Sequence, residues 1–312
     1  MRLYNCCVFV VGCGGIGGYL CELLPQVMAC INLDRHINRG DNSDVSIALN
    51  SEGITNNVPN VFEKLVLIDG DDFSGHNALR QQAVQGSKLV VQMNKIRNKD
   101  AFTTWLNDTE LKGYQTFITP ENSDRIFRGE TDLRCDSAVV FLCVDNHKTR
   151  FEVSKYFESF DKPTLIINGG NKKISGNVTV WAKKWGTTDL SYLDPPIYKV
   201  YPEINDKHDL RPDEVDCGTV TLNNDQTAVT NNMIASIMLS MFSKGIINGF
   251  EDGFMQETRR KDENGNVIKV RKNEVIVDFS TMTMQSLSHS KDLDNTKLYS
   301  ILEGTVNEEQ LN

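Results

Sequence analysis

A glycine-rich turn near the start of the chain most constrains what it can fold into. The residues VVGCGGIGGYLCELL, numbers 10–24, join an apolar strand to an amphipathic helix, and Gly12, Gly14 and Gly17 match the spacing G-x-G-x-x-G. Such a turn holds the phosphates of a nucleotide against the N-terminus of the helix. It serves dinucleotide redox cofactors as well as ATP, so the turn alone leaves both classes open.

Apolar segments typical of strands alternate with helical patterns over the first half of the chain. The predicted strands are 6–11, 64–69, 114–118, 137–144 and 164–168, and the predicted helices are 16–28, 88–107 and 148–160. Strands rich in Val, Ile and Leu are typical of sheets covered on both faces. The order predicts an α/β fold with a doubly wound, largely parallel Rossmann-like sheet and helices on both faces.

Changes in this pattern suggest how the chain is divided. Residues 1–250 are predicted to form one nucleotide-binding domain, with a polar surface insertion at about 35–60. Its apolar, Met-rich helix 230–247 is predicted to bury the face that carries Met233, Ile237 and Met241, in the core or in a subunit interface. Residues 251–312 are predicted to form a β-hairpin over 267–279, led by the turn Asn264-Gly265, and a polar tail.

Composition excludes several function classes. The net charge of −9 over 312 residues offers no basic stripe to a nucleic acid, and no apolar run approaches the roughly 18 residues of a membrane span. The eight cysteines form no C-x-x-C pair, which argues against a zinc ribbon and against a thioredoxin-type site. Seven of them fit apolar strands or helices as core residues, so we expect a cytoplasmic protein.

Polar residues after the second predicted strand distinguish between the two nucleotide classes. An acid at the end of this strand holds a ribose in either class, and Asp69 is a better candidate than Asp34, whose strand is poor. The stretch IDGDDFSGHNALRQQ then supplies Asp71, Asn77 and Arg80. An enzyme that cleaves ATP between its α- and β-phosphates needs such a guanidinium, because charge builds on the leaving pyrophosphate. A surface ion pair is the alternative for Arg80 alone.

A second acidic position ends the fourth predicted strand. In the stretch VVFLCVDNHKTR, Asp145 and Asn146 follow the strand and Arg150 lies one turn into the next helix. Ligands bind at the carboxyl ends of parallel strands, and Mg²⁺ is commonly held by one or two carboxylates together with substrate phosphates. Asp145 therefore fits a metal ligand, and it fits a helix N-cap equally well.

Taken in order, these motifs resemble the ThiF/MoeB/ubiquitin-activating enzyme superfamily. The matching stretches are the loop Gly12 to Gly17, with Gly14 and Gly15 inside it, then Asp69-Gly70-Asp71, then Asn77 to Gln81, and finally Asp145-Asn146 with Arg150. The resemblance implies a ThiF-like adenylyltransferase that uses ATP and Mg²⁺. The enzyme would activate the C-terminal carboxylate of a ubiquitin-like or sulfur-carrier protein that ends in glycine. The alternatives are a dinucleotide-dependent oxidoreductase and a non-catalytic ATP-binding scaffold.

The resemblance also implies a role for each matched residue. Asp69 would hold the ribose, Asn77 and Arg80 the phosphates, and Asp145 the Mg²⁺. Lys88 is the preferred family lysine, and Lys95 is the alternative, because the segment after Arg80 is short.

The chain departs from the family pattern in two places. It lacks the C-x-x-C pairs of zinc-binding members, so no zinc is expected. We expect the enzyme to act as a homodimer, and in the family an N-terminal helix carries a phosphate-directed arginine into the neighbouring subunit. This chain has only five residues before its first strand, so either Arg35 or Arg39 replaces that arginine or the enzyme works without it.

Cys217 lies in a polar stretch ahead of the apolar helix, where some superfamily members carry a cysteine that receives the acyl group as a thioester. PRTRC-type ThiF proteins resemble this chain in that cysteine and in their compactness. The neighbouring Asp216 would raise the pKa of the thiol, which opposes a standing thiolate. A thioester role and a structural role for Cys217 both remain open.

Overall fold

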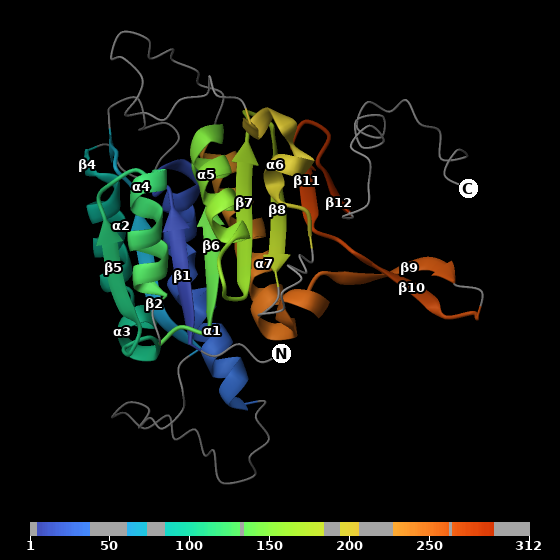
Figure 1. Cartoon of the computed structure of the whole chain (residues 1–312), viewed down its shortest axis with the longest axis horizontal. Coiled ribbons are helices and arrows are strands. Elements are labelled where there is room, and N and C mark those ends of the chain that lie inside the picture. The colour runs from blue at the N-terminus through green and yellow to red at the C-terminus, as the bar shows by residue number, and fades with distance from the viewer. Residues whose placement is uncertain are drawn as a thin grey trace.

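Eight strands form one central sheet in the computed structural model, which describes residues 5–37, 61–73, 85–131, 134–183, 194–205, 227–261 and 264–289. The strand order is β12-β11-β8-β7-β6-β1-β2-β5 (Figure 1). The five strands β7, β6, β1, β2 and β5 run parallel, whereas β8, β11 and β12 add to them in antiparallel fashion. The predicted doubly wound α/β fold is therefore confirmed.

Of the five strands predicted in the first half of the chain, four have bounds close to those observed, and β12 was not predicted. The strands of the sheet are β1 (Cys6–Val11), β2 (Phe62–Ile68), β5 (Glu110–Tyr114), β6 (Ser137–Leu142), β7 (Thr164–Asn171), β8 (Ser175–Lys183), β11 (Glu274–Asp278) and β12 (Thr283–Leu287). The strand predicted at 114–118 in fact ends at Tyr114. It is the edge strand beside β2, and its side chains are only partly buried. Edge strands contain fewer apolar residues, so the hydrophobic pattern placed this strand too late in the sequence.

Helices cover both faces of the sheet. One face carries α1 (Gly15–Ile37), α2 (Lys88–Arg97), α3 (Asp100–Trp105) and α7 (Ala228–Asp252), and the other carries α4 (Pro120–Ser123), the π-helix η2 (Asp124–Arg128) and α5 (His147–Glu158) (Figure 1). Successive side chains of β1 point to opposite faces of the sheet and so contribute to a hydrophobic core on each face. Val8 and Val10 pack in the core on the first face, and Phe9 packs in the core on the second. The short helices α6 (Ile197–Val200) and η3 (Pro202–Asn205) pack near α5.

Two helix predictions need correction. The helix predicted over 88–107 is interrupted at Asn98 and Lys99 and forms α2 and α3. The predicted insertion at 35–60 begins later, because α1 continues to Ile37, and the rest of it lies outside the described residues.

The C-terminal hairpin prediction is wrong in its pairing. Asn264 and Gly265 do form a turn, but it joins β9 (Met255–Lys261) to β10 (Val267–Arg271) in a two-stranded arm that projects from the main sheet (Figure 1). The second half of the predicted hairpin is β11, which pairs with β8 and β12. The alternation that suggested one hairpin spans two strands that belong to different sheets. The division at residue 250 stays a prediction, although β11 and β12 extend the main sheet.

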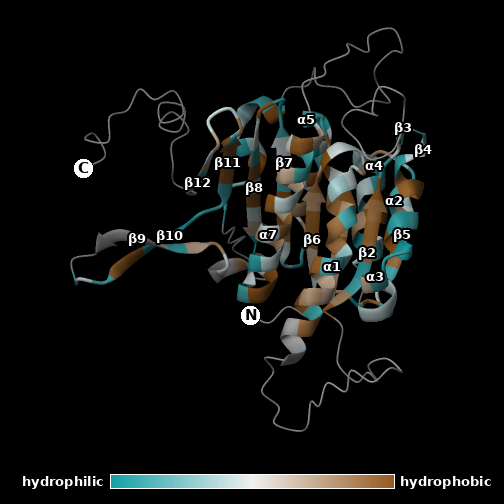
Figure 2. Cartoon of the chain, turned by 180° about the vertical axis from the view of Figure 1, so that it is seen from behind, coloured by the Kyte–Doolittle hydropathy of each residue, from teal (hydrophilic) through white to brown (hydrophobic). Residues whose placement is uncertain are grey.

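Helices α1 and α7 pack against each other and against the sheet. Both are long and apolar enough to span a membrane by composition, yet 61% and 50% of their apolar windows are buried, as in the core helices of a folded protein. The buried face of α7 carries Ile234, Met238 and Phe242. Of the three residues predicted to be buried, Met241 is buried and Ile237 packs partly buried against the core, whereas Met233 is 40% exposed. Figure 2 shows apolar segments on these helices.

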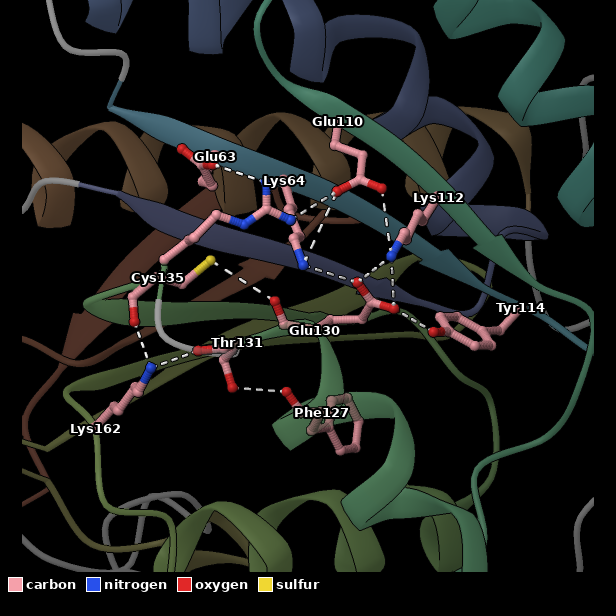
Figure 3. A network of polar contacts seen from close by, with 11 residues as sticks. Glu63, Lys64, Glu110, Lys112, Tyr114, Phe127, Glu130, Thr131, Cys135 and Lys162 are labelled. Atoms are coloured by element: carbon pink, nitrogen blue, oxygen red, sulfur yellow. Dashed lines mark hydrogen bonds and ion pairs between the residues drawn. The ribbon is translucent and has the colours of Figure 1, made fainter.

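A buried ion-pair network lies at the amino edge of the parallel strands, opposite the edge where ligands bind in such folds (Figure 3). Glu130 accepts hydrogen bonds from Lys64 at 3.2 Å, from Lys112 at 3.0 Å and from the hydroxyl group of Tyr114. Lys64 and Glu130 are 1% and 4% exposed. Burial alone would raise the pKa of Glu130, but these three hydrogen bonds outweigh it and lower that pKa. The network therefore holds a carboxylate inside the protein.

Candidate nucleotide-binding site

A cavity opens at the carboxyl ends of the parallel strands, where the sequence places its candidate residues. The predicted residues that line it are Gly12, Gly14, Gly15, Asp69, Asp71, Lys88 and Asp145. They come from the turn after β1, the end of β2, the start of α2 and the loop after β6. Asn77, Arg80 and Cys217 lie outside the described residues, as does Arg39.

The glycine turn takes a shape that side chains would prevent. Gly12 has a φ of +90°, which L-residues rarely adopt, and its amide donates to the carbonyl of Ile68 at 2.9 Å. Gly17 does not line the cavity. It lies in the first turns of α1, where a Cβ atom would come within 1.8 Å of the carbonyl oxygen of Gly12. The third glycine of the motif therefore packs α1 closely against the turn, so that the N-terminus of the helix faces the cavity.

Asp69 joins the glycine turn to the loop after β2. One carboxylate oxygen accepts the amide of Cys13 at 2.5 Å, and the other accepts the amide of Asp71 at 2.8 Å. Burial raises the pKa of Asp69, while Lys88 and the two amide hydrogen bonds act in the opposite direction. A carboxylate has about four acceptor positions, so two remain for a ribose hydroxyl. Asp69 therefore shapes the turn and also lines the cavity.

Lys88 begins α2 and forms an ion pair with Asp71. It is 9% exposed and lines the cavity, whereas Lys95 of the same helix does not. Of the two alternative lysines, Lys88 is thus the one beside the glycine turn. A phosphate group that enters the cavity would compete with Asp71 for its ammonium group.

The structure excludes one of the two interpretations of Asp145, the helix N-cap. The N-cap of α5 is Asn146, whose side chain accepts the amide of Thr149 at 2.8 Å. Asp145 is exposed, lines the cavity and does not cap the helix. Its carboxylate therefore suits a Mg²⁺ ion, although no group of three or more metal-binding side chains occurs among the described residues.

The cysteines near the cavity are structural. Cys13 is fully buried, and a hydrogen bond with Cys21 together with burial raises the pKa of its thiol well above the ordinary value. Of the seven cysteines predicted to lie in the core, six are buried, but Cys30 on α1 is exposed. A thiol with a raised pKa is a poor nucleophile, and Cys13 is a buried core residue, as expected.

A second, larger cavity of about 580 Å³ adjoins the first. The two share three lining residues, namely Asp145, Arg150 and Asn171. The guanidinium group of Arg150 donates to the carbonyls of Val144, at 2.7 Å, and Gly169, at 3.1 Å. Sequence reasoning missed Asn171 and the second cavity. The only signal was the run Asn168 to Asn171 at the end of a buried strand.

Solved structures share this fold at low sequence identity. The microcin C7 biosynthetic enzyme MccB, in complex with N-formylated MccA, matches at 14% identity and a TM-score of 0.51, over 94% of this chain and 67% of that chain. E. coli MccB matches at 15% identity and a TM-score of 0.50, over 93% of this chain and 64% of that chain. PaaA matches at 14% identity and a TM-score of 0.50, over 92% of this chain and 74% of that chain. The chain thus spans about two thirds of the MccB chains. No curated protein sequence matches it.

The family comparison is more specific than the fold. The model of the ThiF family matches residues 53–292, which is more than three quarters of the chain. The matched region includes the segments that carry Asp69, Lys88 and Asp145 and begins after the glycine turn. The chain therefore belongs to the ThiF family and is a nucleotide-binding enzyme of the adenylyltransferase type.

Proposed function

We propose that the protein is an ATP- and Mg²⁺-dependent adenylyltransferase that activates the C-terminal carboxylate of a ubiquitin-like or sulfur-carrier protein. One observation carries the proposal: the glycine turn, Asp69, Lys88 and Asp145 surround a single cavity at the carboxyl edge of the sheet. The MccB structure with its peptide MccA supports a peptide or protein terminus as the class of substrate.

Each residue has a part in this proposal. The amides at the start of α1 and the Lys88 ammonium group hold phosphates, and Asp69 holds the ribose. Asn77 and Arg80, from the segment between β3 (Asp72–Phe73) and β4 (Gly86–Ser87), bind the triphosphate and neutralise the leaving pyrophosphate. Asp145 holds the Mg²⁺, which screens the negative charge of the phosphates when it is bound.

The second cavity supplies a place for the acyl substrate. At about 580 Å³ it falls within the roughly 300–1,000 Å³ of small-molecule sites, so it has room for the last residues of an extended chain. Because it shares Asp145, Arg150 and Asn171 with the nucleotide cavity, a carboxylate bound in it would lie next to the bound phosphates.

Three further features belong to the same proposal. Cys217 receives the acyl group from the adenylate as a thioester. The protein acts as a homodimer in the cytoplasm, and the exposed apolar side chains Met233 and Ile247 of α7 offer part of an interface.

Exchange of labelled pyrophosphate into ATP tests the proposal directly. Purified protein with Mg²⁺ and its carboxylate partner should catalyse this exchange, because formation of an acyl-adenylate is reversible. Small proteins that end in glycine and are encoded near this one are the first partners to try. Equilibrium binding of ATP and of NAD provides the comparison. Binding of NAD without affinity for ATP would refute the adenylation proposal and favour a dinucleotide-dependent oxidoreductase.

A further inference from the structure

The wall shared by the two cavities is where an acyl carboxylate and the α-phosphate must meet. Of its three residues, Asp145 is negatively charged, and Arg150 binds the carbonyls of Val144 and Gly169. Asn171 is the neutral member. It is the last residue of β7, paired with Gly176 of β8, so its backbone is fixed by the sheet.

The side chain of Asn171 is held in one orientation. Its amide nitrogen donates to the side-chain oxygen of Asn231 at 2.6 Å, and Asn231 is fully buried in the first turns of α7. A carboxamide has two N–H donors, and this hydrogen bond uses one of them. The second N–H remains for a ligand in the cavities that Asn171 lines.

Asn231 also connects Asn171 to the glycine turn. A Cβ atom at Gly15 would lie 2.9 Å from the side-chain nitrogen of Asn231, closer than real Cβ contacts. Gly15 thus lets α7 pack against the turn. The amide of Asn171 is consequently set at a fixed position relative to the residues that hold the phosphates, which is what alignment of two reactants requires.

The reaction brings two anions together. A carboxylate oxygen forms a bond to the α-phosphorus, the bond from that phosphorus to the oxygen bridging to the β-phosphate breaks, and pyrophosphate leaves with the electron pair. An N–H donor at the junction reduces the repulsion and orients the carboxylate without adding a charge that would need its own partner. This inference rests on the function proposed above. We propose that Asn171 binds the acyl carboxylate and then the acyl oxygen of the adenylate, while Asn231 and Gly15 hold the Asn171 side chain in place.

Binding of a stable acyl-adenylate mimic separates this role from a structural one. The probe is 5′-O-[N-(acetylglycyl)sulfamoyl]adenosine, compared with AMP by isothermal titration calorimetry. Asn171→Ala should weaken binding of the mimic about tenfold, as the loss of one hydrogen bond to a polar ligand implies, and change AMP binding less than twofold. Asn171→Asp should weaken binding of the mimic further, because a carboxylate cannot donate a hydrogen bond and its negative charge repels the ligand. Asn248→Asp, with the same charge change at an exposed position of α7, is the matched control and should bind both ligands normally.

Each outcome has a defined consequence. Equal losses for the mimic and AMP, or no loss for either, would overturn the role of Asn171. Thermal unfolding of each variant identifies those that fail to fold, and Asn231→Ala provides a second perturbation that leaves Asn171 in the chain. Asn231→Ala should weaken binding of the mimic more than binding of AMP. If the wild type binds neither ATP nor the mimic, the proposed function itself is refuted, and this inference with it.

Discussion

The buried pair of Lys64 and Glu130 provides a sharp test of how this protein is stabilised (Figure 3). In Glu130→Leu, the ammonium group of Lys64, with its side chain 2% exposed, loses its partner at 3.2 Å. Glu110 is 3.9 Å from Lys64 and has a side chain 40% exposed, so it compensates only weakly. Removing one member of a buried ion pair typically costs 3–5 kcal/mol, and we expect about 3 kcal/mol here because of Glu110.

Urea unfolding followed by circular dichroism measures this loss. The free energy of unfolding falls by about 1–3 kcal/mol per M of urea in small proteins, and more steeply in larger chains. A loss of about 3 kcal/mol should therefore lower the urea midpoint by on the order of 1 M. Lys64→Met combined with Glu130→Leu should recover most of the loss, because no uncompensated charge is then buried. Lys112→Met is the control, because its side chain is 38% exposed and a solvent-exposed pair contributes about 1 kcal/mol or less.

The stability supplied by Glu130 should also depend on pH in one direction. Its pKa is lowered in the folded protein, so the contribution is present above the ordinary glutamate pKa of about 4.3 and is lost as pH falls through the folded value. The difference between the wild type and Glu130→Gln should therefore shrink below about pH 4. A Glu130→Leu protein within 1 kcal/mol of the wild type at pH 7, or a double variant no more stable than the single one, would refute this reasoning.

Four other substitutions test the active-site assignments. Arg80→Ala should reduce pyrophosphate exchange about a hundredfold, or roughly 3 kcal/mol, with a smaller effect on ATP binding, because the leaving-group charge develops in the transition state. Asp145→Asn should abolish Mg²⁺-dependent exchange and leave the thermal unfolding curve unchanged; retained exchange would remove Asp145 from the metal site. Cys217→Ala should still form the adenylate but no thiol-sensitive conjugate on a non-reducing gel, so a surviving conjugate excludes the thioester role. Gly17→Ala should abolish ATP binding in a dialysis assay, because its Cβ atom would collide with Gly12.

Sequence periodicity predicted the parallel half of the fold well. The strands β1, β6 and β7 are fully buried over most of their length, and continuous runs of Val, Ile and Leu are typical of strands with both faces covered. The glycine spacing located the turn, since Gly12 and Gly17 satisfy local backbone requirements that few other residues can meet. Asp69 and Asp145 were found because strand ends in such a sheet meet at one edge.

Only the tertiary structure decided the remaining points, because they depend on contacts between distant segments. The pairing of β11 with β8 joins residues almost a hundred positions apart, so local alternation suggested a hairpin instead. The inward face of α7 is set by its packing on α1 and the sheet, and the helix also carries the apolar side chains Met233 and Ile247 at exposed positions. Asn171 and Asn231 belong to no motif, and they meet Gly15 only because α7 packs over the glycine turn. Spacing along a chain reports local geometry, whereas the position of such a side chain is fixed by the packing of whole elements.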